Sequence, residues 1–168
     1  MICFSVGKWN EFTCDAFYEK LSGRMQLPTA RYMLDIFTDG NKQNIAAIHN
    51  HFPAGSVNYG VKKRVYQGQN IVGIVHRKVL GNPSRKEIAI NHVDGLCSKI
   101  RERVSCFTRK ARSFAKRCDD LNHRFEIFGV SHNFIEKKRR LTPAMREGIA
   151  TKPLDWSRIL HARLSMLK

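Results

Sequence analysis

Residues 31–66, RYMLDIFTDGNKQNIAAIHNHFPAGSVNYGVKKRVY, contain the pattern that decides the fold. Arg31 to Thr38 is rich in residues typical of a buried strand, and Asp39-Gly40 favours a turn directly after it. Asn44 to Phe52 has apolar residues at helical spacing before a Pro-Ala-Gly break, and Val57 to Tyr66 has the alternation of a second strand. The order strand, helix, strand predicts an α/β protein with helices packed on a sheet.

The flanking sequence extends this pattern in both directions. Ile2 to Val6 is a short apolar run that predicts a strand, and Glu11 to Met25 has the apolar spacing of a helix. After the central pattern, Ile71 to Val75 favours another strand, and Leu154 to Leu167 favours a final helix. We therefore expect one α/β domain over residues 1–150, followed by a helical C-terminal tail over residues 151–168.

One long amphipathic pattern dominates the second half of the chain. From Leu96 to Phe128, apolar residues recur at steps of three and four with no proline between them. This spacing predicts a long helix, bent or broken near Asp119-Asp120. Its other face is basic, because residues 99–117 hold eight Lys or Arg residues and a single acid, Glu102. Further on, Thr142 is placed to cap a short helix that begins with Pro143.

The charge is the strongest feature of the composition. Thirty Lys and Arg residues face fourteen Asp and Glu, a formal net charge of +16, which favours polyanionic partners such as DNA, RNA or an anionic membrane surface. The excess is +5 over residues 1–94 (12 basic, 7 acidic) and +11 over residues 95–168 (18 basic, 7 acidic), so phosphate contacts are expected mainly in the second half. No apolar run reaches the ~20 residues that span a bilayer, and no signal peptide is recognised. We expect a cytoplasmic protein without a membrane partner.

The cysteines and histidines do not form a recognisable metal motif. The five cysteines include no Cys-x-x-Cys pair, which argues against a disulfide framework and against a zinc knuckle. His49-Asn50-His51 resembles a fragment of a nuclease motif, but it lies in a predicted helix without flanking ligands, so we interpret it as a solvated helix face.

Several short stretches, spread over nearly the whole chain, carry a resemblance to a known family. They are Val6-Gly7-Lys8, Cys14-Asp15-Ala16-Phe17, Thr38-Asp39-Gly40, Gly81-Asn82-Pro83, Val93-Asp94, Phe107-Thr108-Arg109, Ser113-Phe114-Ala115-Lys116-Arg117, His132-Asn133-Phe134, Leu141-Thr142-Pro143-Ala144-Met145 and Gly148-Ile149. In this order the chain resembles the catalytic domain of insertion-sequence transposases with an Asp-Asp-Glu site, in particular those of the insertion-sequence-one type. The match is specific over residues 107–149 and weaker before residue 90.

The resemblance implies a fold and a chemistry. The fold of the family is an RNase H-like α/β core, a mixed sheet with flanking helices. The activity is DNA transposition, in which three carboxylates hold two Mg²⁺ or Mn²⁺ ions that drive strand cleavage and transfer. The first family carboxylate lies upstream of the strand that Ile2 to Val6 matches, so we expect this chain to lack it, together with the first strands and the DNA-reading segment. The resemblance then describes a truncated, catalytically impaired transposase.

Two residues of this sequence match the remaining carboxylates and are the expected catalytic and metal-binding residues. Asp39 matches the second Asp at a strand end, although Asp-Gly is also simply a good turn. Asp94 stands where the family has Glu and is shorter by one methylene, and Gly95 replaces a basic residue. An alternative for Asp94 is the N-cap of the helix that begins at Gly95-Leu96.

The basic residues of the second half are the expected contacts to the DNA backbone, although a solvated helix face is the alternative. They are Lys99, Arg101, Arg109, Lys110, Arg112, Lys116 and Arg117 on the long helix, and Lys137, Lys138, Arg139 and Arg140 in a basic loop. The expected partners are mobile-element ends and target DNA, with a homodimer or association with a full-length transposase, and the expected location is the nucleoid.

Two other interpretations remain open from the sequence. The chain is alternatively a non-catalytic basic module that binds nucleic acid, either a domesticated remnant or an RNA-binding protein. Dependence on a divalent metal through Asp39 separates this interpretation from the transposase. A third interpretation is a fragment that is unstable alone, since missing strands leave a sheet edge exposed.

Overall fold

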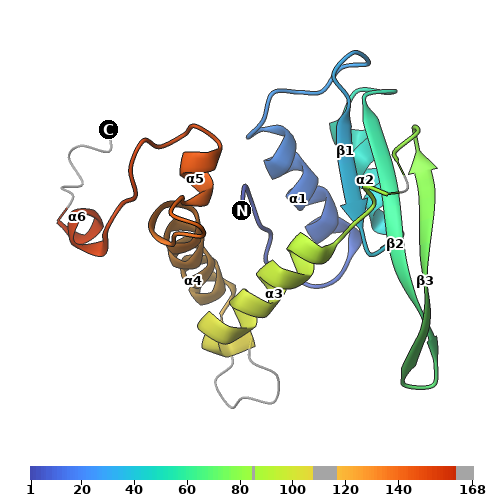
Figure 1. Cartoon of the computed structure of the whole chain (residues 1–168). Helices are drawn as coiled ribbons and strands as arrows, with labels where there is room; N and C mark the ends of the chain where they lie inside the picture. The colour runs from blue at the N-terminus through green and yellow to red at the C-terminus, as the bar shows by residue number, and fades with distance from the viewer. Residues whose placement is uncertain (85, 108–116, 162–168) are drawn as a thin grey trace. The chain divides into compact units, whose positions relative to one another are not determined.

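The computed structural model describes residues 1–84, 86–107 and 117–161. The chain forms two compact units, residues 2–99 and residues 100–168 together with Met1. The first unit contains α1 (Glu11–Ser22), β1 (Leu34–Thr38), α2 (Gln43–His51), β2 (Val57–Gln67) and β3 (Asn70–Leu80) (Figure 1). The boundary between the units falls inside α3 (Asn91–Arg103). None of the helices in the described ranges is long and apolar enough to cross a membrane.

The sheet of the first unit is mixed. β1 runs parallel to β2, and their ladder extends from the pair Leu34–Val57 to the pair Thr38–Val61. β3 pairs with β2 in the antiparallel direction. Gly68, with φ of +62°, opens the two-residue turn between β2 and β3, the position that a type II′ hairpin reserves for glycine. These strands, with α1 and α2, confirm the predicted α/β class and the strand–helix–strand order.

Alternate residues of β2 build the core of this unit. Val57, Tyr59 and Val61 are 6%, 1% and 6% exposed and form one apolar cluster with residues of α1 and α2. The intervening residues face the other side of the sheet, where Gly60 lies against Ile88, which is 1% exposed. A Cβ at Gly60 would lie 2.7 Å from Cγ1 of Ile88, so this close approach requires glycine. The sheet is thus covered on both faces over the first half of β2.

Two strand predictions differ from the structure. Ile2 to Val6 forms no strand, and Ile2 is 64% exposed. A short apolar run alone does not distinguish a strand from an extended segment that has no neighbour with which to pair. β3 is longer than the predicted Ile71–Val75, because its pairing with β2 continues to Leu80.

The second unit is helical in its described residues. After α3 come the short 3₁₀ turn η1 (Ser105–Phe107), α4 (Cys118–Val130), the π-helical turn η2 (Ser131–Ile135), α5 (Pro143–Arg146) and α6 (Trp156–Leu160). Thr142 caps α5 as predicted, since its Oγ1 accepts a hydrogen bond from the backbone N–H of Met145 at 3.2 Å. In the tail, the described part of the predicted helix Leu154–Leu167 is α6.

The prediction of one long basic helix is wrong for the described residues, because α3 ends at Arg103 and the 3₁₀ turn follows. Val104 is buried at 5% exposure, and the ring of Phe107 lies 5.0 Å from that of Phe125 in an edge-to-face contact. Apolar residues spaced by three and four fit one long helix and also two shorter helices that share a core. The periodicity therefore does not place the break.

Candidate nucleic-acid interface

Asp39 lies directly after β1, at the position that the sequence predicts. Its neighbour Thr38 is the last residue of the parallel ladder and pairs with Val61 of β2. Gly40 follows with φ of +91°, and a Cβ there would lie 2.5 Å from Cγ1 of Val61 and 3.0 Å from Cε of Lys63. The turn after β1 thus packs closely against β2, and Asp39 within it is exposed.

A network of hydrogen bonds among buried and partly buried polar groups holds the turn after β1 in place. The hydroxyl groups of Thr38 and Tyr59 are 2.7 Å apart, and the side-chain amide of Asn44 donates to Thr38 Oγ1 at 3.2 Å. The backbone N–H of Gly40 donates to the same oxygen at 3.1 Å. Since Asn44 and Tyr59 are buried, these bonds satisfy polar groups that would otherwise destabilise the core. The network fixes the backbone on both sides of Asp39.

An open cavity of about 400 Å³ adjoins this turn, and Asp39 is among its lining residues. Several amide side chains line the cavity, and two of them form hydrogen bonds that stabilise the fold. Asn10 accepts from the N–H of Thr13 and caps α1, and Asn44 belongs to the network below Asp39. These amides therefore hold the elements around the cavity in place.

Asp94 lies in the first turn of α3 and forms an ion pair with Arg64 of β2, with 2.7 Å between Oδ2 and Nη2. One turn earlier on the same helix, the amide oxygen of Asn91 accepts from Nζ of Lys62 at 3.1 Å. The prediction that Asp94 caps a helix beginning at Gly95 is wrong, because the helix begins four residues earlier, at Asn91. Asp94 instead ties α3 to the basic segment of β2.

Within the first unit, Asp94 pairs with Arg64 of the basic segment Lys62–Arg64 of β2, and Gly40, next to Asp39, lies close to Lys63 of the same segment. The carboxylate oxygens of Asp39 and Asp94 are the ligand type that Mg²⁺ and Mn²⁺ prefer. However, Asp94 is bound to Arg64, and within the described ranges no three His, Cys, Asp or Glu side chains gather as a metal site. The arrangement does not fit a complete three-carboxylate site, and a cation at Asp94 would have to displace Arg64.

The His49-Asn50-His51 stretch lies on α2, as predicted, but two of its residues join α2 to α1 instead of facing only solvent. Nε2 of His51 lies 2.9 Å from Oδ1 of Asp15, and the amide of Asn50 donates to the same oxygen at 3.1 Å. The hydrogen bond from Asn50 and then the close approach of the His51 ring hold the pKa of the Asp15 carboxyl below its usual value. This cluster is a structural link between two helices.

The predicted DNA contacts of the second half are described only in part. Lys99 is half-buried and Arg101 exposed on α3, and the exposed Arg117 pairs with Asp119 at 3.6 Å. Arg109, Lys110, Arg112 and Lys116 lie outside the described residues. No common basic surface can therefore be drawn through the residues of the predicted long helix.

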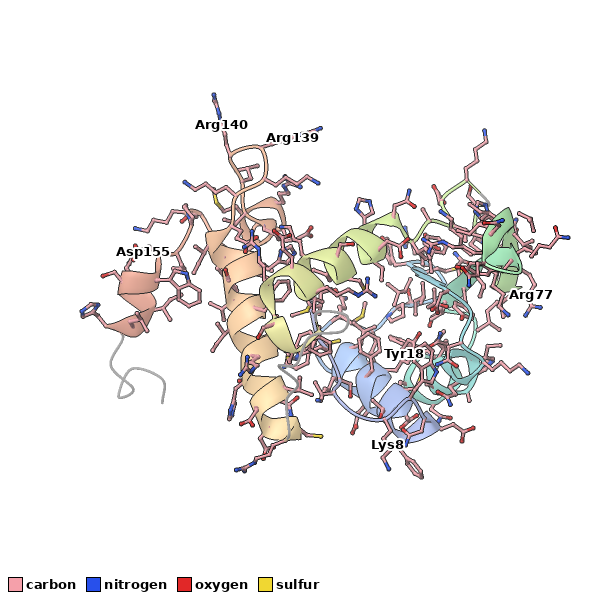
Figure 2. The ribbon with its side chains drawn as sticks, turned by 90° about the horizontal axis from the view of Figure 1, so that it is seen from below. Lys8, Tyr18, Arg77, Arg139, Arg140 and Asp155 are labelled. Carbon is pink, nitrogen blue, oxygen red and sulfur yellow. The ribbon has the colours of Figure 1, made fainter. Side chains whose placement is uncertain are left out.

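The basic loop forms a tight turn. Lys137, Lys138, Arg139 and Arg140 are all exposed, and Lys138 and Leu141 form an isolated antiparallel bridge around the two arginines. Arg139 and Arg140 have φ of 53° and 72°, the pattern of a type I′ turn, in which Asn and Gly are preferred. Figure 2 shows both arginine side chains projecting from this turn away from the ribbon.

Sequence reasoning missed a second group of cations, on the hairpin formed by β2 and β3. Lys62, Lys63 and Arg64 lie on β2, and Arg77 and Lys78 lie on β3, where Arg77 is at the outer side of the hairpin (Figure 2). Residues 57–80 contain these five Lys and Arg residues and no Asp or Glu. The absence of acids over this stretch, together with Gly68 between two strand-prone runs, is the sequence signal that would have predicted a basic hairpin.

No protein-family model, curated protein or solved structure matches this chain.

Proposed function

We propose that this chain is a DNA-binding protein of the Asp-Asp-Glu transposase type, catalytically impaired by itself, and that its first unit corresponds to part of an RNase H-like core. The observation that carries the proposal is that two carboxylates lie near the basic segment Lys62–Arg64 of β2: Asp39 precedes Gly40, which approaches Lys63, and Asp94 pairs with Arg64. Carboxylates that hold a metal and cations that hold phosphate are needed together at a strand-transfer site.

The net charge supports DNA as the partner. A formal charge of +16 spread over 168 residues, with exposed cations on the β2–β3 hairpin and at the Lys137–Arg140 turn, favours a polyanion. We expect contacts to phosphates to dominate the affinity, because exposed Lys and Arg side chains attract the DNA backbone whatever its base sequence. Association as a homodimer or with a complete transposase belongs to the same proposal.

The Arg64–Asp94 ion pair favours a second candidate function, a non-catalytic nucleic-acid-binding module. In this arrangement the Asp94 carboxylate stabilises the contact between α3 and β2 and is not offered to a metal. Such a module binds DNA or RNA with the same cations, and its binding is indifferent to divalent metal.

The test of the proposal measures binding of a labelled duplex by fluorescence anisotropy over a series of NaCl concentrations. Each neutralised phosphate adds about 0.9 to the log–log slope, so contacts to several phosphates give a steep loss of affinity with salt. A flat dependence, or an absence of binding, refutes both candidate functions.

Metal dependence separates the two candidates. Calorimetric titration with Mn²⁺ in the presence of duplex is expected to detect binding that Asp39→Asn abolishes, while Asp35→Asn, a matched loss of an exposed carboxylate on β1, leaves it unchanged. If Mn²⁺ does not bind, or binds equally to both variants, the non-catalytic module is the better description. Metal-dependent strand transfer by the purified chain would contradict the proposed catalytic impairment.

A further inference from the structure

The β2–β3 hairpin extends beyond the sheet. β1 pairs only with Val57–Val61, so the rest of β2, Lys62–Gln67, has β3 as its strand partner (Figure 1). Two-stranded ribbons are marginally stable in water unless a third element or a partner covers them. We therefore expect the hairpin beyond Val61 to be stabilised by contact with a binding partner.

The base of this ribbon is cationic, and its two faces are used differently. Lys62 and Arg64 turn toward α3, where Asn91 and Asp94 engage them. On the other face Arg77 pairs across the ladder with Val61, and Lys63 pairs with Val75. Lys63 and Arg77 are therefore diagonal neighbours on one face, and both are exposed.

The distal part of the ribbon has the opposite chemistry. Residues 65–75 contain no charged side chain. Their large apolar residues are nevertheless open to solvent: Val65, Tyr66, Ile71, Val72, Ile74 and Val75 are 42%, 57%, 53%, 56%, 54% and 50% exposed. Tyr66 and Ile71 are cross-strand partners near the turn. An exposed apolar cluster of this kind on a small unit indicates a binding surface.

We propose that the β2–β3 hairpin enters the major groove of duplex DNA, with Lys63 and Arg77 on the phosphates at its base and the apolar tip against the base edges. A two-stranded ribbon fits the major groove, which is about 12 Å wide, and apolar side chains make contact there with thymine methyl groups. The five cations and the absence of acids over residues 57–80 make the ribbon complementary to a polyanion. This inference rests on the proposed DNA-binding function and adds the element that engages the groove.

The experiment compares two pairs of charge-removing substitutions in the full chain. Lys63→Ala with Arg77→Ala removes the basal cations of the hairpin. Lys20→Ala with Lys86→Ala removes the same charge from exposed positions elsewhere in the first unit. The hairpin pair is expected to lower the log–log salt slope of duplex binding by about 1.8, two phosphate contacts, while the control pair leaves it near the parent value. Equal slopes for both pairs would overturn the proposal, since net charge alone would then explain binding.

A second variant tests the tip. Tyr66→Ser with Ile71→Ser is expected to weaken duplex binding by the same factor at every salt concentration. It is also expected to remove the protection of guanine N7, a major-groove atom, from dimethyl sulfate. Unchanged affinity and unchanged protection would overturn the role of the tip. Far-UV circular dichroism and thermal melting of each variant establish that the fold is retained.

The outcomes also separate this inference from the function on which it depends. If the parent chain does not bind duplex DNA, the proposed function fails and the hairpin proposal fails with it. If the parent binds and the hairpin variants bind equally well, only the hairpin proposal fails. If the tip variant abolishes a dimer in sedimentation analysis without weakening DNA binding, a second copy of the chain covers the tip, and the groove is not its partner.

Discussion

The two halves of β2 have the same backbone and opposite roles. Over Val57–Val61 the strand pairs with β1, and from Tyr59 also with β3, and its three odd-numbered residues are at most 6% exposed. Over Lys62–Gln67 the strand keeps only the β3 ladder, and from Lys63 onward every residue is exposed. The number of neighbouring elements, rather than the conformation of the strand, decides which half is core and which half is surface.

The change in residue type follows this change in neighbours. In the first half, apolar side chains leave water for a cluster with α1 and α2, which stabilises the folded unit. In the second half, Lys62 and Arg64 bind α3, while Lys63, Val65 and Tyr66 are exposed to water, where they contribute little to folding. We therefore expect substitutions in Val57–Val61 to change mainly the stability of the protein, and substitutions in Lys62–Gln67 to change mainly its binding.

The largest expected effect tests this separation directly. Tyr59→Ala removes a ring that is 1% exposed, together with its hydroxyl contact to Thr38, and should lower the free energy of unfolding by about 3–5 kcal/mol. Ile71→Ala in the other half, at 53% exposure, should change it by less than about 0.5 kcal/mol. Urea unfolding of both variants measures the difference, and comparable losses would show that the hairpin is part of the folding core.

A smaller effect is expected at the second basic turn of the molecule. Arg139→Asn with Arg140→Gly replaces two residues at positive φ by the pair that a type I′ turn prefers. The backbone strain that is relieved should raise the free energy of unfolding by about 1 kcal/mol. The loss of two exposed cations should at the same time lower the salt slope of DNA binding. Arg139→Lys with Arg140→Lys, which keeps the charge and the strain, is the matched control.

A gain in stability without a change in DNA binding would mean that this turn does not contact DNA. The hairpin of the first unit would then be the better candidate for the phosphate contacts. A loss of stability would contradict the assignment of strain to the two arginines.

The smallest effect is expected at the link between α1 and α2. Because the hydrogen bond from Asn50 and the nearby His51 ring lower the pKa of Asp15 in the folded protein, this group stabilises the fold above its unfolded pKa of about 3.9. The contribution is lost as the pH falls through the lower, folded pKa. Asp15→Asn should therefore show slightly lower stability at pH 7 and a shallower loss between pH 5 and pH 2 in urea unfolding. Identical pH profiles for parent and variant would exclude the link.

The local patterns of the chain allowed a correct prediction wherever neighbouring residues decide the structure. The strand before Asp39, the helix over 44–52 and the Thr142 cap all depend on residue types within one or two turns of chain. The predictions failed where a distant partner decides the outcome. Ile2 to Val6 has no strand with which to pair, and the helix that begins at Asn91 ends where Val104 becomes buried.

The candidate site shows the same division. Asp39 was located from the sequence, because a strand followed by Asp-Gly places a carboxylate at a strand end. The bond between Asp94 and Arg64 and the exposure of the hairpin were not predictable, because they join residues far apart in the chain.

The sequence by itself determined the α/β class of the first unit, the excess of positive charge and the position of Asp39, since composition and short-range periodicity are properties of the chain alone. Only the tertiary structure decided that half of β2 is core and half is ribbon, and that Asp94 is held by an arginine. Burial and ion pairing depend on which segments meet in space. The residue pattern of a single strand does not reveal which segments will pack beside it.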